Sequence, residues 1–215
     1  AHPVFHAPNL GYTLQIWNGA SIASQTGIPV VCNFRVTDVA AGGQGAPLVP
    51  VGDYYLFNQH QACLNLGGFA NISFDDSSGR IAFDICQVNI ILNHLAQKAG
   101  KEYDVNGDLG CEGKVVISLL AKFNGLEYYK QPFPKSLGRE WLENTFLPLL
   151  REEKCSQADL IRTLYQHITD QIAGVIKSNG ITNVLLTGGG TYNSFLIALL
   201  KEHTDAKFII PDDSV

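Results

Sequence analysis

The sequence predicts an α/β protein with mixed sheets flanked by helices. Short strands dominate the first half of the chain, and strands alternate with helices in the second half, which is typical of α/β folds. In addition, two of the expected strands run directly into clustered glycines, at Gly67-Gly68 and at Gly188-Gly189-Gly190. Such turns let a bound molecule approach the backbone closely.

For residues 1–60 the sequence predicts only short strands and a helical turn. We expect a strand at 12–16, a helical turn at 20–24 and a buried strand at 28–32, where apolar and β-branched side chains follow one another. The glycine-rich stretch 40–47 cannot pack a core, but it permits close approach to a ligand. We therefore assign residues 1–60 to part of a first lobe that carries a substrate and catalytic loop.

Residues 61–215 predict a β-meander followed by alternating helices and strands, and we assign them to a second lobe that holds the glycine turns. The expected strands are 62–66, 71–74, 80–86, 183–187 and 206–210, and the expected helices are 88–99, 115–126, 157–178 and 192–202. The helix at 157–178 has the clearest signals. Ser156 and Asp159 form a capping pattern before it, and Gly180 follows as a stop.

The composition excludes several classes of protein. Hydrophobic residues make up 46% and charged residues 16% of the chain, with a net charge of -5, so we expect a globular protein without affinity for nucleic acid or an anionic membrane. No apolar run approaches the roughly 20 residues of a membrane span. The five cysteines lack a Cys-x-x-Cys pair, which predicts buried or half-buried free thiols and a reducing cytoplasm. The chain contains no methionine, and we expect it to be an internal piece of a longer protein.

The two glycine turns are the candidates for a nucleotide site. The turn at Gly67-Gly68 can expose N–H groups to phosphate oxygens, although a plain hairpin turn has the same pattern. The turn at Gly188–Gly190 suits a flat ligand with anionic groups near a helix start, although a tight strand–helix connection explains it as well. Two such turns in one lobe favour a nucleotide between them.

Asp38 is the candidate general base. It precedes the run Gly42–Gly45, so its carboxylate can face a substrate without crowding by side chains. There it can take a proton from a hydroxyl or a water, as phosphoryl transfer to an alcohol requires. Arg35 can hold a phosphate or a carboxylate, and a turn-capping role is the ordinary alternative for Asp38. Asp84 ends an expected strand, where it can bind Mg²⁺ or cap the helix near Asn89.

Read in order, these segments resemble the anhydro-N-acetylmuramic acid kinase family, a sugar-kinase branch of the actin-like ATPases. The resemblance covers nearly the whole chain, and the long glycine-rich run is specific, which argues against other actin-like sugar or carboxylate kinases. The matching segments are His2–Pro8, Asp38–Pro50, Leu64–Ile72, Pro134–Glu140, and Gly188–Gly190 with Asn193.

The resemblance implies a two-lobed actin-like, ribonuclease H-like fold with ATP in the cleft and one lobe incomplete in this chain. It implies a phosphotransferase with an alcohol group as acceptor. The family cleaves the 1,6-anhydro bridge of anhydro-N-acetylmuramic acid with water and phosphorylates the freed O6, in the cytoplasmic recycling of peptidoglycan. ATP and Mg²⁺ are the expected cofactors, with no metal ligand assigned in the chain, and a homodimer is a further expectation.

By position in the matching motifs, the resemblance assigns a role to each candidate residue. Asp38 is expected to activate the water, Gly67 and Gly68 to face the ATP phosphates, and Gly188–Gly190 to face the adenosine. The expected substrate-binding residues are His6, Arg35, Gly42, Gly43, Gln44, Asp84 and Asn89. The expected nucleotide-binding residues are Gly67, Gly68, Asn71, Gly188, Gly189, Gly190 and Asn193.

The chain also departs from the family pattern. Asn33 stands where Asp is usual before Phe-Arg, and Asp84-Ile85-Cys86-Gln87-Val88-Asn89 stands where Asp-Thr-Gly-Pro-Gly-Asn is usual. The family's Gly-Thr-Ser-x-Asp-Gly phosphate loop does not occur in the sequence. These departures motivate an alternative function, that of a non-catalytic or differently specific sugar-binding relative.

Overall fold

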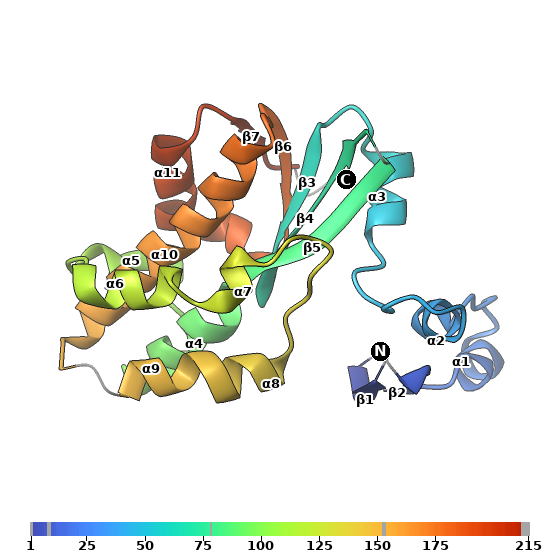
Figure 1. Ribbon diagram of the computed structural model, residues 1–215. Helices are drawn as coiled ribbons and strands as arrows, with labels where there is room; N and C mark the ends of the chain where they lie inside the picture. Colours follow the sequence, from blue (N-terminus) through green and yellow to red (C-terminus); the bar gives the residue numbers. More distant parts are fainter. Residues whose placement is uncertain (1, 8–9, 78, 152–153, 212–215) are drawn as a thin grey trace. The chain divides into compact units, whose positions relative to one another are not determined.

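The computed structural model describes residues 2–7, 10–77, 79–151 and 154–211 (Figure 1). The chain divides into two compact units, Ala1–Val51 and Gly52–Val215. The boundary between lobes that we expected near residue 60 stays a prediction, because a compact unit and a functional lobe need not coincide. The helix α3 (Pro50–Leu56) spans the division between the two units.

The first unit contains a hairpin and two short helices. The strands β1 (His2–Ala7) and β2 (Tyr12–Ile16) pair antiparallel, and the helices α1 (Gly19–Thr26) and α2 (Phe34–Ala40) follow. Asn18 caps α1, because its side chain accepts a hydrogen bond of 2.9 Å from the backbone nitrogen of Ser21. The expected strand at 12–16 and the helical turn at 20–24 are confirmed.

Two expectations for the first unit were wrong. Residues 28–32 form no strand, and Ile28 and Val31 are 63% and 78% exposed. Pro29 has no N–H for a strand ladder, and within the described residues no strand pairs with this segment. The helix α2 was not foreseen, since Asn33 begins it from a left-handed φ of 69°, a conformation that asparagine tolerates well.

The second unit is built on a five-stranded mixed sheet. Its strands are β3 (Ala62–Leu66), β4 (Phe69–Asp76), β5 (Gly79–Gln87), β6 (Asn183–Thr187) and β7 (Lys207–Ile209), in the order β5-β4-β3-β6-β7. Only β4 runs antiparallel to the others. A three-stranded meander extended by two parallel strands beside its first strand is the ribonuclease H-like arrangement, so the predicted fold class is confirmed.

The helices expected in the second unit are confirmed, and several short ones are added. The α-helices are α4 (Asn89–Lys98), α5 (Asp108–Cys111), α6 (Ile117–Asn124), α7 (Glu127–Lys130), α8 (Arg139–Trp141), α9 (Leu147–Arg151), α10 (Gln157–Ser178) and α11 (Ser194–His203). Short 3₁₀ turns lie at Val105–Gly107 and Gly189–Tyr192, and a π-helical turn lies at Leu142–Phe146. As the sequence indicated, Ser156 caps α10 by accepting a hydrogen bond of 3.1 Å from the Asp159 nitrogen.

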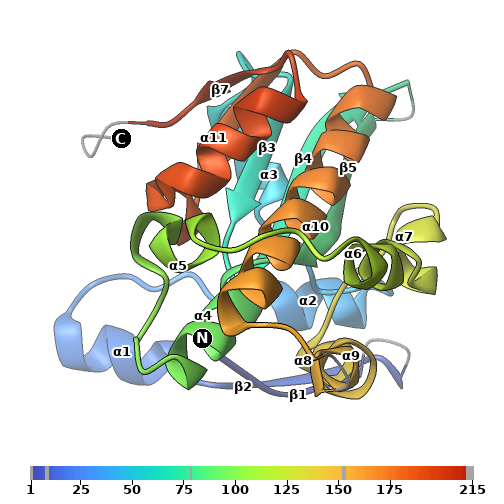
Figure 2. The ribbon, with the colours of Figure 1, turned by 90° about the vertical axis from the view of Figure 1, so that its left-hand side faces the viewer.

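The hydrophobic core lies on one face of this sheet. Figure 2 shows α10 and α11 side by side across that face. Leu64 and Leu66 of β3 and Ile168 of α10 are 0% exposed and belong to one continuous cluster. Each such side chain contributes about 1.5–3 kcal/mol by burial. The ends of β3 and β6, from which the glycine turns emerge, are therefore fixed by the core.

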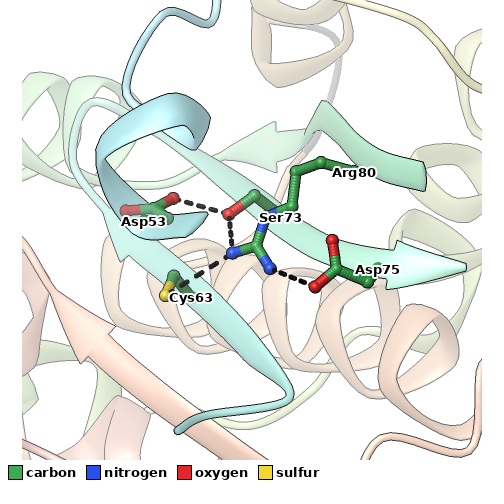
Figure 3. Close-up of polar contacts among 5 residues, drawn as sticks. All are labelled: Asp53, Cys63, Ser73, Asp75 and Arg80. Atoms are coloured by element: carbon green, nitrogen blue, oxygen red, sulfur yellow. Dashed lines mark hydrogen bonds and ion pairs between the residues drawn. The ribbon is translucent and has the colours of Figure 1, made fainter. Parts of the chain in front are cut away.

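The opposite face of the sheet carries a polar cluster (Figure 3). Arg80 donates to Ser73 at 2.9 Å and pairs with Asp75 at 3.2 Å, and Ser73 donates to Asp53 of α3 at 2.5 Å. Cys63 lies beside the guanidinium, and burial raises the pKa of its thiol to about 11. The cluster ties α3 to the sheet, and burial keeps the Cys63 thiol protonated although the Arg80 guanidinium opposes that shift of its pKa.

The remaining cysteines and the helices bear on two further expectations. Cys86 is buried and Cys32 and Cys155 are half-buried, but Cys111 is exposed, so the expectation of burial was wrong at that position. No disulfide joins any of the five cysteines, all of which lie in the described part of the chain. In the part of the chain that the structure describes, every helix is too short or too polar to cross a membrane.

His167 of α10 is a titratable group inside the core. It is 0% exposed, with its Nδ1 2.6 Å from Oδ1 of Asn124 and its Nε2 3.0 Å from the hydroxyl of Tyr129. A neutral ring serves such a pair by donating from one nitrogen and accepting at the other. Burial lowers the pKa of His167 to about 3.

We expect the free energy of unfolding to fall as the pH drops from about 6.5 towards about 3. His167 stays neutral in the folded protein over this window, whereas the unfolded chain takes up a proton there, so stability rises with pH. Urea unfolding at several pH values measures the slope. His167→Asn should make it shallower, while Gly174→Ala, which changes no titratable group of the same helix, should leave it unchanged. An unaltered slope in His167→Asn would contradict the assignment.

Candidate functional site

The two glycine turns touch each other at one edge of the sheet. β3 and β6 are parallel neighbours, so the turns that follow Leu66 and Thr187 leave the sheet at the same edge. A Cβ added to Gly188 would lie 3.0 Å from the carbonyl oxygen of Leu66, and one added to Gly190 would lie 2.8 Å from it. Gly188 also has a φ of 84°. Glycine at both positions therefore allows the second turn to lie directly against the end of β3.

Asn89 joins these two turns. Its Nδ2 donates a hydrogen bond of 3.0 Å to the carbonyl oxygen of Leu66 and lies near Gly190. The backbone nitrogens of Val88 and Asn89 donate to the carbonyl oxygens of Gly68 and Gly67, at 2.8 Å and 3.2 Å. The start of α4 is thus held against the first turn. We expected Asn89 to contact the substrate, but the structure places it among the expected nucleotide-binding residues.

A cavity of about 310 Å³ opens beside this junction. Its volume lies at the lower end of the roughly 300–1,000 Å³ that ligand pockets occupy. Its walls come from the second glycine turn, the start of α4 and the segment before α5, and the lining residues are Asn89, Leu92, Asn93, Tyr103, Asp104, Val105, Asn106, Tyr165, Gly189, Tyr192 and Asn193. Gly189 and Asn193 were expected here from the sequence. Tyr103 and Tyr192 are 52% and 73% exposed, and such aromatic rings suit a planar base.

A row of polar side chains crosses the sheet next to the first turn. In the strand register Asn71 of β4 faces Asn65 of β3 on one side and Asp84 of β5 on the other, and Asn65 faces Thr187 of β6. Residues paired in this way share one face of the sheet. Asn65 donates to the hydroxyl of Thr187 at 3.2 Å. Sequence reasoning missed Asn65 and Thr187, although each is a polar residue at the end of an apolar strand.

Asp84 connects this row to the segment 134–140. Its carboxylate accepts a hydrogen bond of 2.8 Å from the Leu137 nitrogen, and its backbone nitrogen donates to the carbonyl oxygen of Lys135 at 3.1 Å. Burial raises the pKa of the Asp84 carboxyl, and the hydrogen bond from Leu137 opposes that shift. Capping of α4 by Asp84 was a wrong alternative, since Val88 is the capping residue.

The residues between Asp84 and Asn89 point into the protein. Ile85 is 2% exposed, and Cys86, Gln87 and Val88 are 0% exposed. β5 continues through this segment, because Cys86 pairs with Ala70 and Gln87 pairs with Phe69. None of the four lines the cavity described above. The departure from the family pattern at 85–88 therefore changes buried side chains.

Asp38 lies in the first unit, where a glycine loop folds back over it. Its Oδ2 accepts a hydrogen bond of 2.7 Å from the Gly45 nitrogen, and Arg35 donates to the Gly45 carbonyl oxygen at 2.7 Å. A Cβ added to Gly43 would lie 2.2 Å from Oδ2 of Asp38, so only glycine fits there. The turn-capping role is thus real. It also places the half-buried carboxylate directly beneath the loop, next to Gly42 and the exposed Gln44.

The remaining expectations concern a histidine and metals. His6 pairs with Thr13 in the hairpin, and its side chain lies outside the described part of the structure. Among the residues that the structure does describe, no three histidine, cysteine or acidic side chains gather as a metal site.

The chain resembles proteins of one family along nearly its whole length. Residues 1–213 match the family model for anhydro-N-acetylmuramic acid kinase. The anhydro-N-acetylmuramic acid kinase of Nitrosomonas europaea is 35% identical over 97% of this chain and 59% of its own length. Those of Pseudomonas savastanoi and Rhodococcus erythropolis are 37% and 35% identical, over 98% and 94% of this chain and 58% and 55% of their own lengths. The chain thus spans less than two thirds of these curated relatives.

Among solved structures the likeness is weaker. The activator of the 2-hydroxyisocaproyl-CoA dehydratase from Clostridium difficile, with bound ADPNP, is similar at a TM-score of 0.47 and 16% identity, over 75% of this chain and 57% of its own. A likeness of this degree does not by itself establish a shared fold or function.

We expect Gly190→Ala to weaken both the packing of the turns and nucleotide binding. Its Cβ would lie 2.7 Å from the Cβ of Leu66, which the core holds in place, so the turn must move away. Binding of ADP and urea unfolding measure the two effects.

Gly174→Ala provides the matched control. Nothing lies within 4 Å of a Cβ added to Gly174 in α10. This change should raise the free energy of unfolding by about 0.5–1 kcal/mol, because alanine is the better helix former. Equal ADP affinity in Gly190→Ala and the unchanged protein would show that the close approach of the turns is irrelevant to binding.

Proposed function

The chain belongs to the anhydro-N-acetylmuramic acid kinase family, and on that premise we propose that the protein phosphorylates 1,6-anhydro-N-acetylmuramic acid with ATP while hydrolysing its anhydro bridge. The observation that carries this proposal is the junction of the two glycine turns beside a cavity. The turns come from strands far apart in the sequence, yet both meet at Leu66 and Asn89. A nucleotide site needs backbone N–H groups that the phosphates can approach closely.

We assign the adenosine to the cavity and the phosphates to the turns. Tyr103 and Tyr192 offer aromatic surface to the base, and Gly189 and Asn193 line the same space. Gly67 and Gly68 are half-buried and exposed, respectively, and do not line the cavity, which agrees with a role towards the phosphates. Asn65, Asn71 and Asp84 extend this polar surface across the sheet.

We assign to Asp38 the activation of the water. Its carboxylate takes a proton from water while the water oxygen bonds to C1 of the sugar and the bond between C1 and O6 breaks. The freed O6 then bonds to the γ-phosphorus, and the bond from that phosphorus to the β,γ-bridging oxygen breaks to give ADP. The proton leaves Asp38 for solvent. The products are N-acetylmuramic acid 6-phosphate and ADP, so the sugar gains one water and one phosphoryl group.

Arg35 and the glycine loop keep this base in place. The guanidinium of Arg35 holds the Gly45 carbonyl, and the Gly45 nitrogen holds Asp38. We therefore give Arg35 a positioning role in addition to the substrate contact that the resemblance implies. Gly42, Gly43 and Gln44 form the part of the loop next to the carboxylate, and we assign them, with His6, to the sugar.

Mg²⁺ is expected to enter with the nucleotide. Phosphoryl transfer from ATP uses this ion to neutralise charge on the phosphates. The described residues gather no cluster of ligands for it, so we assign it no protein ligand. We also propose a cytoplasmic location, because ATP is present there and thiols stay reduced there. A homodimer stays a prediction from the resemblance.

The alternative function has no observation in its favour. It was motivated by the altered segment 84–89 and by the phosphate loop that does not occur in the sequence, and the side chains that differ from the family pattern within 84–89 are buried. The two ends that match the pattern, Asp84 and Asn89, both make hydrogen bonds within the candidate site.

We expect Asp38→Asn in the full-length protein to lower turnover by about 10²–10⁴-fold, the usual contribution of a general base. The asparagine oxygen can still accept from the Gly45 nitrogen, so the loop and ATP binding should be retained. Product mass, with ATP, Mg²⁺ and anhydro-N-acetylmuramic acid as reactants, measures the coupled reaction.

Asp75→Asn is the matched control, because it changes an exposed carboxylate of the polar cluster outside the site and should retain activity. Wild-type activity in Asp38→Asn would remove Asp38 as the base. A phosphorylated product that lacks the added water would separate the kinase function from the hydrolysis.

A further inference from the structure

We propose that Asp104 and Tyr165 are positioning residues of the nucleotide site, which orient the side chain of Asn193 and so fix the turn Gly189–Tyr192 in the cavity wall. This inference rests on the proposed function, because it takes the ligand of the cavity to be a nucleotide. It adds two residues that carry no motif of the family resemblance. Both line the cavity and are buried, Asp104 at 5% and Tyr165 at 0% exposed, and the hydrogen bond from Asn193 to the Tyr165 hydroxyl connects them to the turn.

A chain of hydrogen bonds leads from the Asp104 carboxylate to the start of α11. The Tyr165 hydroxyl donates to Oδ2 of Asp104 at 3.0 Å, and Nδ2 of Asn193 donates to the same hydroxyl at 2.6 Å. Oδ1 of Asn193 accepts a hydrogen bond of 3.0 Å from the Leu196 nitrogen. Asn193 is thereby the capping residue of α11 and the last member of the chain.

The direction of every bond in this chain is set by Asp104. A carboxylate can only accept, and Asp104 also accepts from the nitrogens of Leu109 and Gly110, at 2.8 Å and 3.2 Å. Tyr165 must therefore give its one proton to Asp104 and can only accept from Asn193. The amide of Asn193 is then oriented with its nitrogen towards Tyr165 and its oxygen towards α11. Burial raises the pKa of Tyr165, so the hydroxyl keeps that proton.

The surrounding packing leaves these groups little freedom. A Cβ on Gly110 would lie 2.3 Å from the Tyr165 ring, and a Cβ on Gly107 would lie 2.9 Å from Oδ1 of Asn193. The 3₁₀ turn Val105–Gly107 and the helix α5 therefore pack directly against Asn193 and Tyr165. Hydrogen-bonded side chains in such surroundings have a single arrangement.

The consequence for the cavity follows from the position of Asn193. Its backbone nitrogen donates to the Gly190 carbonyl at 3.1 Å, which closes the turn that contains Gly189 and Tyr192. That turn lines the cavity beside Asp104 and Tyr165. A side chain at 193 that is free to rotate would loosen this wall, and binding would then have to order it.

The test is the affinity of the full-length protein for ADP, measured by calorimetry. Tyr165→Phe keeps the ring and removes the hydroxyl, so Nδ2 of Asn193 loses its acceptor. We expect about tenfold weaker binding of ADP, equivalent to about 1.4 kcal/mol. Asp104→Asn should also weaken the binding of ADP, because the new side chain carries an NH₂ donor where the carboxylate only accepts. The double variant should bind ADP no more weakly than the weaker-binding single variant, because both changes break the same chain of hydrogen bonds.

Tyr129→Phe is the matched control. It removes the hydroxyl of a half-buried tyrosine of the same unit, which bonds to Gln87 and His167, and Tyr129 does not line the cavity. Urea unfolding without nucleotide should show a loss of stability in both tyrosine variants, but only Tyr165→Phe should bind ADP more weakly.

The outcomes separate this inference from the proposed function. Failure of the unchanged protein to bind ADP would overturn the proposed function itself. Normal ADP affinity in Tyr165→Phe, together with reduced stability, would show that Tyr165 is a structural residue only. If Tyr165→Phe does not fold, the Asp104→Asn protein decides: unchanged affinity there overturns the inference.

Discussion

The candidate nucleotide site depends on one close approach, that of the turn at Gly188–Gly190 to the backbone of Leu66. Leu66 is packed in the core and is 0% exposed. Any side chain larger than hydrogen at Gly188 or Gly190 would therefore push the second turn away from it. The Leu66 carbonyl then accepts the Asn89 amide, which brings the start of α4 to the same point. The end of β3, the start of α4 and the second glycine turn thus meet at Leu66, and the cavity lies beside this point because the last two segments form its walls.

The loop around Asp38 is held by a different kind of interaction. Among the described side chains of the first unit, Val39 is a buried hydrophobic one at 2%, whereas Leu10, Ile16 and Val31 are all more than two thirds exposed. Burial therefore contributes little to the loop around Asp38. Its geometry comes from two hydrogen bonds to Gly45 and from a glycine at position 43. The nucleotide turns have a rigid core behind them, but the proposed base depends on local polar contacts.

Much of the second unit could be predicted from the sequence, because its signals are local. The cap at Ser156 and the apolar spacing of α10 fixed that helix to the residue, and the glycines marked both turns. The failures have a physical reason as well. The apolar run at 28–32 was taken for a strand because composition cannot show whether a partner strand exists. Asn65 and Thr187 were missed because their alignment depends on strand register, which is not visible in either segment alone.

The segment 84–89 shows how a departure from a family pattern should be weighed. A strand alternates its side chains between two faces, and the irregularity between Ala70 and Asn71 shifts the register of β5 within this segment. Asp84 lies before the shift and bonds to Leu137, while Asn89 lies after the strand and bonds to Leu66. The four residues between them are buried, and Ile85, Cys86 and Val88 belong to the core, whereas Gln87 accepts a hydrogen bond from the Tyr129 hydroxyl. The sequence difference is therefore weak evidence for a lost activity, because Asp84 and Asn89, which match the pattern, keep their hydrogen bonds on either side of it.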